Sequence, residues 1–123
     1  MSSFLVISSV AGSFITALLM GGWLYWSVRV SDRLVVSNVA SQQMSWVDAS
    51  LYCKTLPDKE WRLPSMNELF GLHYGRRHGL IANTDFWSDS LILERGFGLN
   101  TRLGWFSFDH ISDDDHVICV RRP

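Results

Sequence analysis

The chain of 123 residues carries 11 Lys and Arg against 12 Asp and Glu, and its formal net charge is -1. All of these charged side chains lie at or after Arg29, so the first 28 residues carry none. A water-facing helix or sheet normally has a charged face, so this asymmetry excludes one uniform soluble domain. It leaves an apolar leader and about 95 further residues, enough for one small domain. The near-neutral balance, without a block of Lys and Arg, also argues against a nucleic-acid-binding protein.

The leader contains an uncharged apolar run of 25 residues, from residue 4 to residue 28. A helix of that length exceeds the roughly 30 Å hydrocarbon core of a bilayer, so the run predicts a single transmembrane anchor over residues 1–30. The alternative is a cleaved signal peptide, which needs a basic start, a shorter apolar core and a small-residue cleavage site. The run ends instead in Trp23, Tyr25 and Trp26, whose rings favour the membrane–water interface. We therefore expect a retained anchor.

One face of the predicted anchor consists of small residues. They recur every four positions, at Ser9, Ser13, Ala17 and Gly21. Such a face lets two helix backbones approach closely, which is how helices associate in lipid. Gly, Ala and Ser are common in any membrane helix, but four in register are stronger evidence than one pair. We expect this face to contact another membrane protein or a second copy of the chain.

Two signals disagree about the side of the membrane on which the rest of the chain lies. Arg29 and Arg33 follow the predicted span and no Lys or Arg precedes it, which indicates a cytoplasmic domain by the positive-inside rule. The two cysteines, Cys53 and Cys119, indicate the opposite, because a Cys pair in a small domain outside the cytoplasm normally forms a disulfide. Two buried free thiols in a cytosolic domain are the alternative that these residues leave open.

The part of the chain after the leader begins with one predicted strand and one predicted helix. Leu34-Val35-Val36 is a β-branched run that predicts a first strand, and residues 31–43 hold this strand and a connecting segment. Ser45 opens an S-x-x-D capping box, after which apolar residues recur at helical spacing. We predict a helix over about residues 46–56, with Cys53 on its buried face.

The following segments predict a second helix and then strands. Residues 61–64 read Trp-Arg-Leu-Pro and must be extended, because the proline biases the preceding residue away from the α region. Ser65 and Glu68 form a second capping box, which opens a helix through about Leu72. Frequent glycines then predict turns that join short strands. The strand candidates are residues 86–88, 103–108 and 117–120, and the tryptophans predicted to lie in the core are Trp46, Trp61, Trp87 and Trp105.

The order of these motifs resembles a known family. Four blocks carry the resemblance: Ser45-Trp46-x-x-Ala49-x-x-Tyr52-Cys53-x-x-Leu56, Trp61-Arg62-Leu63-Pro64-Ser65-x-x-Glu68-Leu69, Phe86-Trp87-Ser88 and Val117-Ile118-Cys119-Val120-Arg121. They are similar to the DUF1566 family, which includes the C-terminal domain of the Legionella collagen-like adhesin. The resemblance implies an α+β, C-type-lectin-like domain over residues 44–123. It also implies a disulfide between Cys53 and Cys119, and hence a periplasmic domain on a bacterial inner-membrane anchor.

Two polar clusters are candidate binding sites. His73, Arg76, Arg77 and His78 form a cationic loop that could meet a glycan, a lipid head group or an acidic partner, and an ordinary exposed loop is the alternative. Residues 113–116 read Asp-Asp-Asp-His but lack the alternating ligands and the glycine of a calcium loop, so they predict a solvated turn. The sequence also lacks the EPN, QPD and WND triplets of sugar-binding C-type lectins. We expect no metal and no cofactor.

The chain offers little for catalysis. Ser88 and Asp89 could be drawn into a triad with a histidine, but no nucleophile-elbow glycines support that arrangement. We therefore predict a non-enzymatic accessory subunit that is anchored in the membrane, associates with another membrane protein and presents loops at about residues 73–85 and 91–102 to a protein partner. The alternative is an adhesin-type domain that recognises glycans or surfaces.

Overall fold

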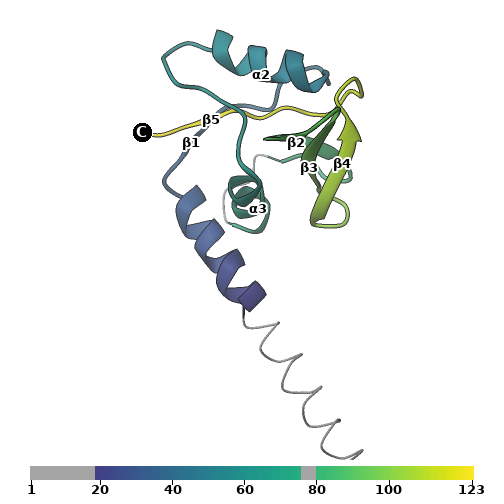
Figure 1. Cartoon of the computed structure of the whole chain (residues 1–123). Coiled ribbons are helices and arrows are strands. Elements are labelled where there is room, and N and C mark those ends of the chain that lie inside the picture. Colours follow the sequence, from purple (N-terminus) through teal and green to yellow (C-terminus); the bar gives the residue numbers. More distant parts are fainter. Residues whose placement is uncertain (1–18, 76–79) are drawn as a thin grey trace, which may run out of the picture.

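The computed structural model describes residues 19–75 and 80–123 (Figure 1). These ranges form an α+β structure with antiparallel strands and one disulfide, as the sequence predicts. The elements are an N-terminal helix over residues 19–31, β1 (Val35–Val36), α2 (Trp46–Thr55), α3 (Met66–Tyr74), β2 (Asp85–Ile92), β3 (Arg95–Asn100), β4 (Trp105–His110) and β5 (Val120–Arg121).

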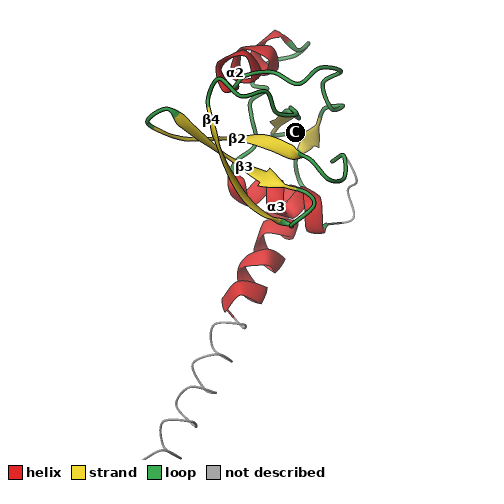
Figure 2. Cartoon of the chain, turned by 90° about the vertical axis from the view of Figure 1, so that its right-hand side faces the viewer, coloured by secondary structure: helices red, strands yellow, loops and turns green. Residues whose placement is uncertain are grey.

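The strands form two antiparallel sheets, one with the order β1-β5 and one with the order β2-β3-β4. The β1–β5 pair lies between α2 on one side and α3 on the other, in both views of the molecule (Figures 1 and 2). The three-stranded sheet stands beside this pair and contacts α3 through β2 and β3. The N-terminal helix lies on the α3 side and leads away from the sheets (Figure 2).

The segment of residues 115–121 runs through the middle of the domain. On one side it receives hydrogen bonds from the connecting segment, where Ser37 N–H donates to the Cys119 carbonyl and Ala40 N–H to the Val117 carbonyl, both at 2.9 Å. On its other side, Arg62 pairs with Val120. The four residues 117–120 are fully buried, as their apolar run predicts.

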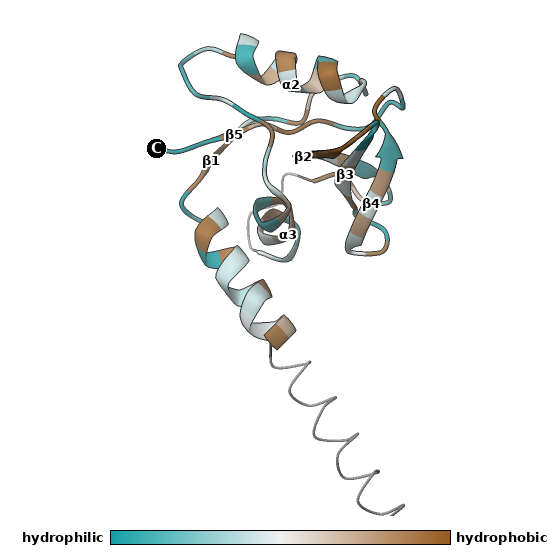
Figure 3. Ribbon diagram, viewed as in Figure 1, coloured by the Kyte–Doolittle hydropathy of each residue, from teal (hydrophilic) through white to brown (hydrophobic). Residues whose placement is uncertain are grey.

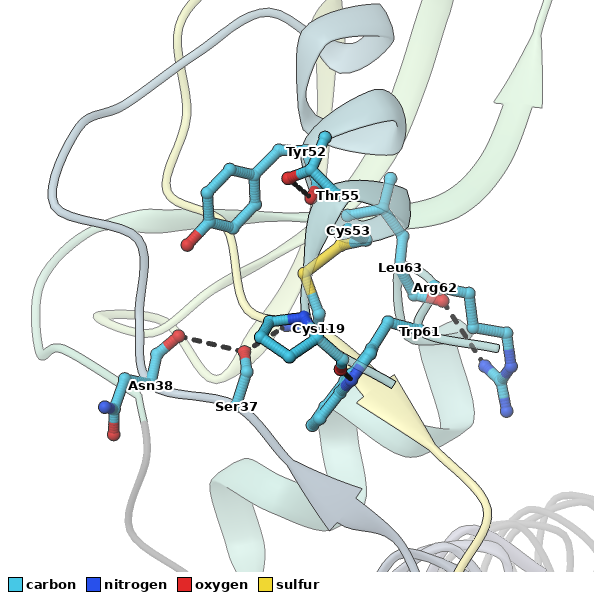
Figure 4. The surroundings of a disulfide bond; sticks show 10 residues. Ser37, Asn38, Tyr52, Cys53, Thr55, Trp61, Arg62, Leu63 and Cys119 are labelled. Atoms are coloured by element: carbon cyan, nitrogen blue, oxygen red, sulfur yellow. Dashed lines mark hydrogen bonds between the residues drawn. A yellow bond between two sulfur atoms is a disulfide. The ribbon is translucent and has the colours of Figure 1, made fainter. Parts of the chain in front are cut away.

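The disulfide joins α2 to this central segment (Figure 4). Cys53 and Cys119 are bonded, with their Cα atoms 5.6 Å apart, which confirms the pairing implied by the family resemblance. Both residues are fully buried in an apolar cluster that also contains Ala49, Leu63 and Trp87. The bridge therefore fixes α2 over the centre of the core.

Both helices begin at the predicted serine caps, and the reciprocal capping box forms between Ser65 and Glu68. The hydroxyl of Ser45 accepts a hydrogen bond from Asp48 N–H, and that of Ser65 from Glu68 N–H. The Glu68 carboxylate accepts from Ser65 N–H at 2.8 Å and from both Arg62 guanidinium nitrogens at 2.6 and 2.9 Å. Burial raises the pKa of Glu68, but these hydrogen bonds outweigh burial and hold that pKa below its usual range. The ion pair between Arg62 and Glu68 thus joins the extended segment of residues 61–64 to α3.

The structure corrects the predicted loop over residues 91–102, most of which is strand. Gly96 and Gly98, two of the glycines that predict turns in the sequence, lie inside β3. A Cβ at Gly96 would meet the Trp87 ring at 2.7 Å, and one at Gly98 would meet the Phe86 carbonyl oxygen. A glycine in the sequence can indicate a turn, or it can indicate a strand position where another group packs closely against the backbone. The sequence alone does not distinguish these two possibilities.

The prediction that all four tryptophans of the domain lie in the core is wrong for Trp105. Trp87 is fully buried and Trp46 and Trp61 are half-buried, but Trp105 is 47% exposed. Trp105 begins β4, which is an edge strand of the three-stranded sheet. An edge strand has a neighbour on one side only, so its rings stay partly open to solvent.

The N-terminal helix packs closely against α3. Ser27 and Ser31 are buried, and Ser31 donates a hydrogen bond to the Glu68 carbonyl at 3.1 Å. A Cβ at Gly71 would meet the Ser31 hydroxyl and the Ser27 carbonyl oxygen. Gly71 therefore lets the two helix backbones touch.

Within residues 19–75 and 80–123, none of the helices combines the length and the hydropathy that a membrane crossing requires. Most of the predicted anchor, residues 1–18, lies outside the described ranges, and with it Ser9, Ser13 and Ala17. The structure describes the last part of that run, which Figure 3 shows as a mixture of hydrophobic and hydrophilic positions.

Removal of the disulfide by Cys53→Ala with Cys119→Ala should lower the free energy of unfolding by about 4 kcal/mol, because the bridge closes a long loop in the unfolded chain. Urea unfolding of the full chain in detergent measures the change. Wild-type protein unfolded in a thiol reductant is the control and should show a similar loss. Equal stability of the oxidised wild type and the double variant would contradict the prediction.

Gly71→Ala should push the N-terminal helix away from α3. The added methyl group overpacks the contact at a cost of about 1–3 kcal/mol, which exceeds the gain of up to about 1 kcal/mol from better helix propensity. Hydrogen–deuterium exchange should become faster over residues 23–31. Gly21→Ala is the matched control, since a Cβ there meets nothing within 4 Å. The same exchange rate in both variants would refute the close contact.

Candidate functional site

An aromatic cluster joins the N-terminal helix, α3 and β4. Its centre is Phe70, a buried residue of α3. Four rings surround it with centroid distances of 4.9 to 6.2 Å. They belong to Trp23, Tyr74, Trp105 and Phe106.

The outer rings of this aromatic cluster form an exposed rim. Tyr74, Trp105 and Phe106 are each between 40% and 49% exposed. Leu103 extends the rim in the turn before β4 and is more exposed still. The Tyr74 hydroxyl donates to the Gly104 carbonyl at 2.6 Å, which holds that turn against α3. Half-buried rings fixed on a rigid support are typical of a surface that contacts a partner.

The three aromatic residues predicted for the membrane interface have different environments. Trp23 packs against Phe70 and donates from its indole nitrogen to the Asn67 side chain at 3.0 Å. Tyr25 and Trp26 are more than half exposed. Gly21, the described member of the small-residue row, is also exposed.

Of the predicted cationic loop, the structure describes only His73. Its ring is half-buried beside Tyr74, and burial lowers the pKa of His73 below its usual value. Arg76, Arg77 and His78 lie outside the described ranges.

A second cationic region, which sequence reasoning missed, lies between the N-terminal helix and the C-terminal tail. An open groove of about 700 Å³ is lined there by Tyr25, Trp26, Arg29, Arg33 and Arg122, among others. These arginines form no ion pair with the described residues. Guanidinium groups beside aromatic rings can bind a ligand that combines an anionic group with an apolar part. The sequence separates Arg33 from Arg122 by most of the domain, so no local pattern predicts that they meet.

Three carboxylates from distant segments also meet. Asp85 begins β2, Asp109 lies near the end of β4, and Asp115 follows the turn after β4. One oxygen atom of each carboxylate lies within 4.8 Å of the other two. We call Asp85, Asp109 and Asp115 the carboxylate cluster.

Asp115 corrects the prediction of a solvated turn over residues 113–116. Asp113 and Asp114 are exposed as predicted, but Asp115 is only 7% exposed. Its backbone exchanges two hydrogen bonds with Met44, at 3.0 and 3.1 Å, which draws the residue into the core. The sequence shows three identical residues in a row and no sign that the third pairs with the distant Met44.

The Asp115 carboxyl is electrostatically strained. Burial raises its pKa, and the neighbouring carboxylates of Asp109, Asp85 and Asp113 raise it further, to about 8. Burial also raises the pKa of Asp85, against a hydrogen bond from the Asn100 amide at 2.7 Å that lowers it. The Oδ2 atom of Asp115 is buried and has no hydrogen-bond partner among the described residues.

The unfolding free energy should depend on pH through Asp115. Its pKa is about 8 in the folded chain against 3.8 for the unperturbed group, so the folded chain binds more protons between these values. Stability should therefore fall as pH rises from about 4 to about 8 and should change little through this group above about 8. Asp115→Asn, which cannot ionise, should lack this fall.

Urea unfolding at several pH values measures the difference between the two curves. Asp85, Asp109, Asp113 and His116 face the group and are present in both proteins. Asp114→Asn is the control and should keep the wild-type slope. Parallel curves for the wild type and Asp115→Asn would show that Asp115 does not carry the effect.

The comparisons with known proteins bear on the fold. No family model matches the sequence, and no curated protein matches it. Among solved structures, the chain is similar to botrocetin, a C-type-lectin-like snake venom protein, with a TM-score of 0.55 and 12% sequence identity. The similarity covers 74% of this chain and 92% of the botrocetin chain. At this identity the match shows the fold alone, and the chain has a C-type-lectin-like fold.

Proposed function

We propose that this chain is a non-enzymatic accessory subunit of the bacterial inner membrane. In this proposal the apolar run before residue 29 is a single-pass anchor, the C-type-lectin-like domain lies in the periplasm, and the exposed rim of the aromatic cluster contacts another membrane protein. The observation that carries the proposal is the position of this rim beside the N-terminal helix. Membership of the DUF1566 family is part of the same proposal.

The exposed rim supports binding to a protein. Tyr74, Leu103, Trp105 and Phe106 together present apolar surface that a folded domain normally buries. Aromatic residues are enriched among the residues that dominate binding energy at interfaces. Phe70 and the Tyr74 hydrogen bond hold these rings in place before binding, which lowers the entropy lost on association.

The N-terminal helix supports a partner that is itself in the membrane. Trp23, Ser27 and Ser31 fix this helix to α3, so the rim keeps a constant position relative to the helix. The uncharged run of residues 4–28 includes the first part of this helix. In this proposal the partner therefore contacts both the anchor and the rim.

The disulfide supports a periplasmic rather than a cytoplasmic domain. Disulfides persist in oxidising compartments and are rare in the cytosol. The bond between Cys53 and Cys119 is fully buried and occupies both cysteines of the chain. This outweighs Arg29 and Arg33, two positive charges whose topological effect is modest.

The surroundings of Ser88 support a role without catalysis. Ser88 is buried, and its hydroxyl donates to the Phe97 carbonyl at 2.7 Å. A serine nucleophile needs its hydroxyl hydrogen-bonded to a general base in an accessible site. Asp89 is exposed and does not orient a base toward Ser88.

A glycan- or surface-recognising adhesin is the second candidate. The C-type-lectin-like fold favours it. It ranks below protein binding because the exposed rim of the aromatic cluster is mainly apolar. Saccharides present many hydroxyl groups, which need polar partners.

Trp105→Ser should weaken association with the partner. Loss of a central aromatic residue at an interface costs about 2 kcal/mol or more, which weakens binding about 30-fold. The measurement is co-purification of tagged full-length chain from membranes in mild detergent, followed by quantitative mass spectrometry. Phe108→Ser is the matched control, since Phe108 lies on the same strand with the same 47% exposure but outside the aromatic cluster.

The proposal fails if the wild-type chain purifies as a monomer, or if both variants retain the same membrane protein. A glycan array probed with the detergent-solubilised full chain distinguishes the second candidate. Glycan binding by the wild type that Trp105→Ser removes would favour the adhesin and contradict the accessory subunit.

A further inference from the structure

The groove between the N-terminal helix and the C-terminal tail has one wall that the helix provides. Its volume of about 700 Å³ lies in the range of pockets that hold small molecules. Tyr25, Arg29 and Arg33 recur every four positions along the helix and the turn after it, so they share one face. Trp26 and Val30 lie beside them and also line the groove. This face is distinct from the face that packs on α3, so it stays open to a ligand.

The opposite wall of the groove comes from the other end of the chain. In the antiparallel pair of β1 and β5, Val35 lies opposite Arg121. The next position of the same register places Leu34 opposite Arg122, and both of these residues line the groove. The pairing of two strands therefore fixes the site at which Arg122 joins the arginines of the helix.

The three arginines of the groove have no acidic partner. All 12 Asp and Glu side chains of the chain lie within the described ranges, and the ion pairs formed there do not include Arg29, Arg33 or Arg122. Glu68 also lines the groove, but its two carboxylate oxygens accept hydrogen bonds from Arg62 at 2.6 and 2.9 Å. The groove therefore presents positive charge that an anionic ligand can neutralise.

We propose that this groove binds the head group of an anionic phospholipid. Guanidinium groups pair with phosphate through two parallel hydrogen bonds, which suits Arg33 and Arg122. The rings of Tyr25 and Trp26 are more than half exposed and can contact the glycerol and the first part of the acyl chains. The inference rests on the proposed function, because the apolar run must be an anchor for Arg29 to lie at the level of the head groups.

The lipid site also accounts for two features of the charge distribution. In the proposed topology, Arg29 and Arg33 lie on the periplasmic side, where the positive-inside rule disfavours them. Binding to a lipid phosphate gives these two charges a function there. Arg122 does not flank the anchor in the sequence, so a general attraction of flanking residues to the membrane does not explain its position in the groove.

The test is lipid binding by the purified full chain in mild detergent, measured by native mass spectrometry. Phosphatidylglycerol should bind with one lipid per chain and at least tenfold more tightly than phosphatidylcholine. Arg122→Gln should weaken the binding of phosphatidylglycerol about fivefold, which is the typical contribution of one arginine near head groups. Combination with Arg33→Gln should weaken it further. Both arginines are exposed, so these variants should keep the unfolding temperature of the wild type.

Arg121→Gln is the matched control. It removes the same charge one residue away, but the Arg121 guanidinium lies outside the groove, 5.3 Å from the centre of the Trp61 ring and 3.8 Å from the Asp58 carboxylate. This variant should bind phosphatidylglycerol within twofold of the wild type. Inorganic phosphate at millimolar concentration should not displace the lipid, because it makes no use of the aromatic rings.

Three results would overturn the lipid site. They are equal affinity for the two lipids, equal binding by Arg122→Gln and Arg121→Gln, and displacement by inorganic phosphate, which would indicate a site for a soluble anion. Extraction of membranes with alkaline carbonate tests the anchor separately. A chain released by carbonate would refute the proposed function and the lipid site together. A chain that stays in the membrane but does not prefer phosphatidylglycerol would refute the lipid site alone.

Discussion

The central constraint of this structure is the segment of residues 115–121, because every layer of the domain is bonded to it. The connecting segment pairs with it on one side, and Arg62 on the other. The disulfide from α2 ends at Cys119. At its start, His116 pairs with Phe86 and so connects the three-stranded sheet. This segment, whose middle residues 117–120 are apolar and fully buried, thus connects elements that lie far apart in the sequence.

Sequence reasoning succeeded where the signal is local. The two helix starts, the α+β class and the buried apolar run before Arg121 depend on neighbouring residues. The cysteine pairing is not local, and the family resemblance implied it. Sequence reasoning failed where the outcome depends on distant pairings. Gly96 and Gly98 predict turns in the sequence, but in the structure they allow residues of β2 to pack closely against β3. Neighbouring residues in the sequence do not reveal such a contact. The exposure of Trp105 depends on the position of β4 at a sheet edge, and the burial of Asp115 on its bridge to Met44.

The N-terminal helix and the lectin-like domain form one mechanical unit over the described residues. The contact of Gly71 with Ser27 and Ser31 brings the two helices together, and Trp23 adds the first ring of the aromatic cluster. The rim of the aromatic cluster is therefore coupled to the direction of this helix, rather than attached through a flexible linker. In the proposed function, such coupling would restrict the orientations in which the chain and its partner can meet and would lower the entropy lost on binding.

The carboxylate cluster is best understood against this architecture. Asp115 belongs to the central segment, where an asparagine or a serine would avoid the repulsion from Asp109 and Asp85. A buried carboxyl with an unpaired oxygen lowers stability, and residues that do so are characteristic of functional sites.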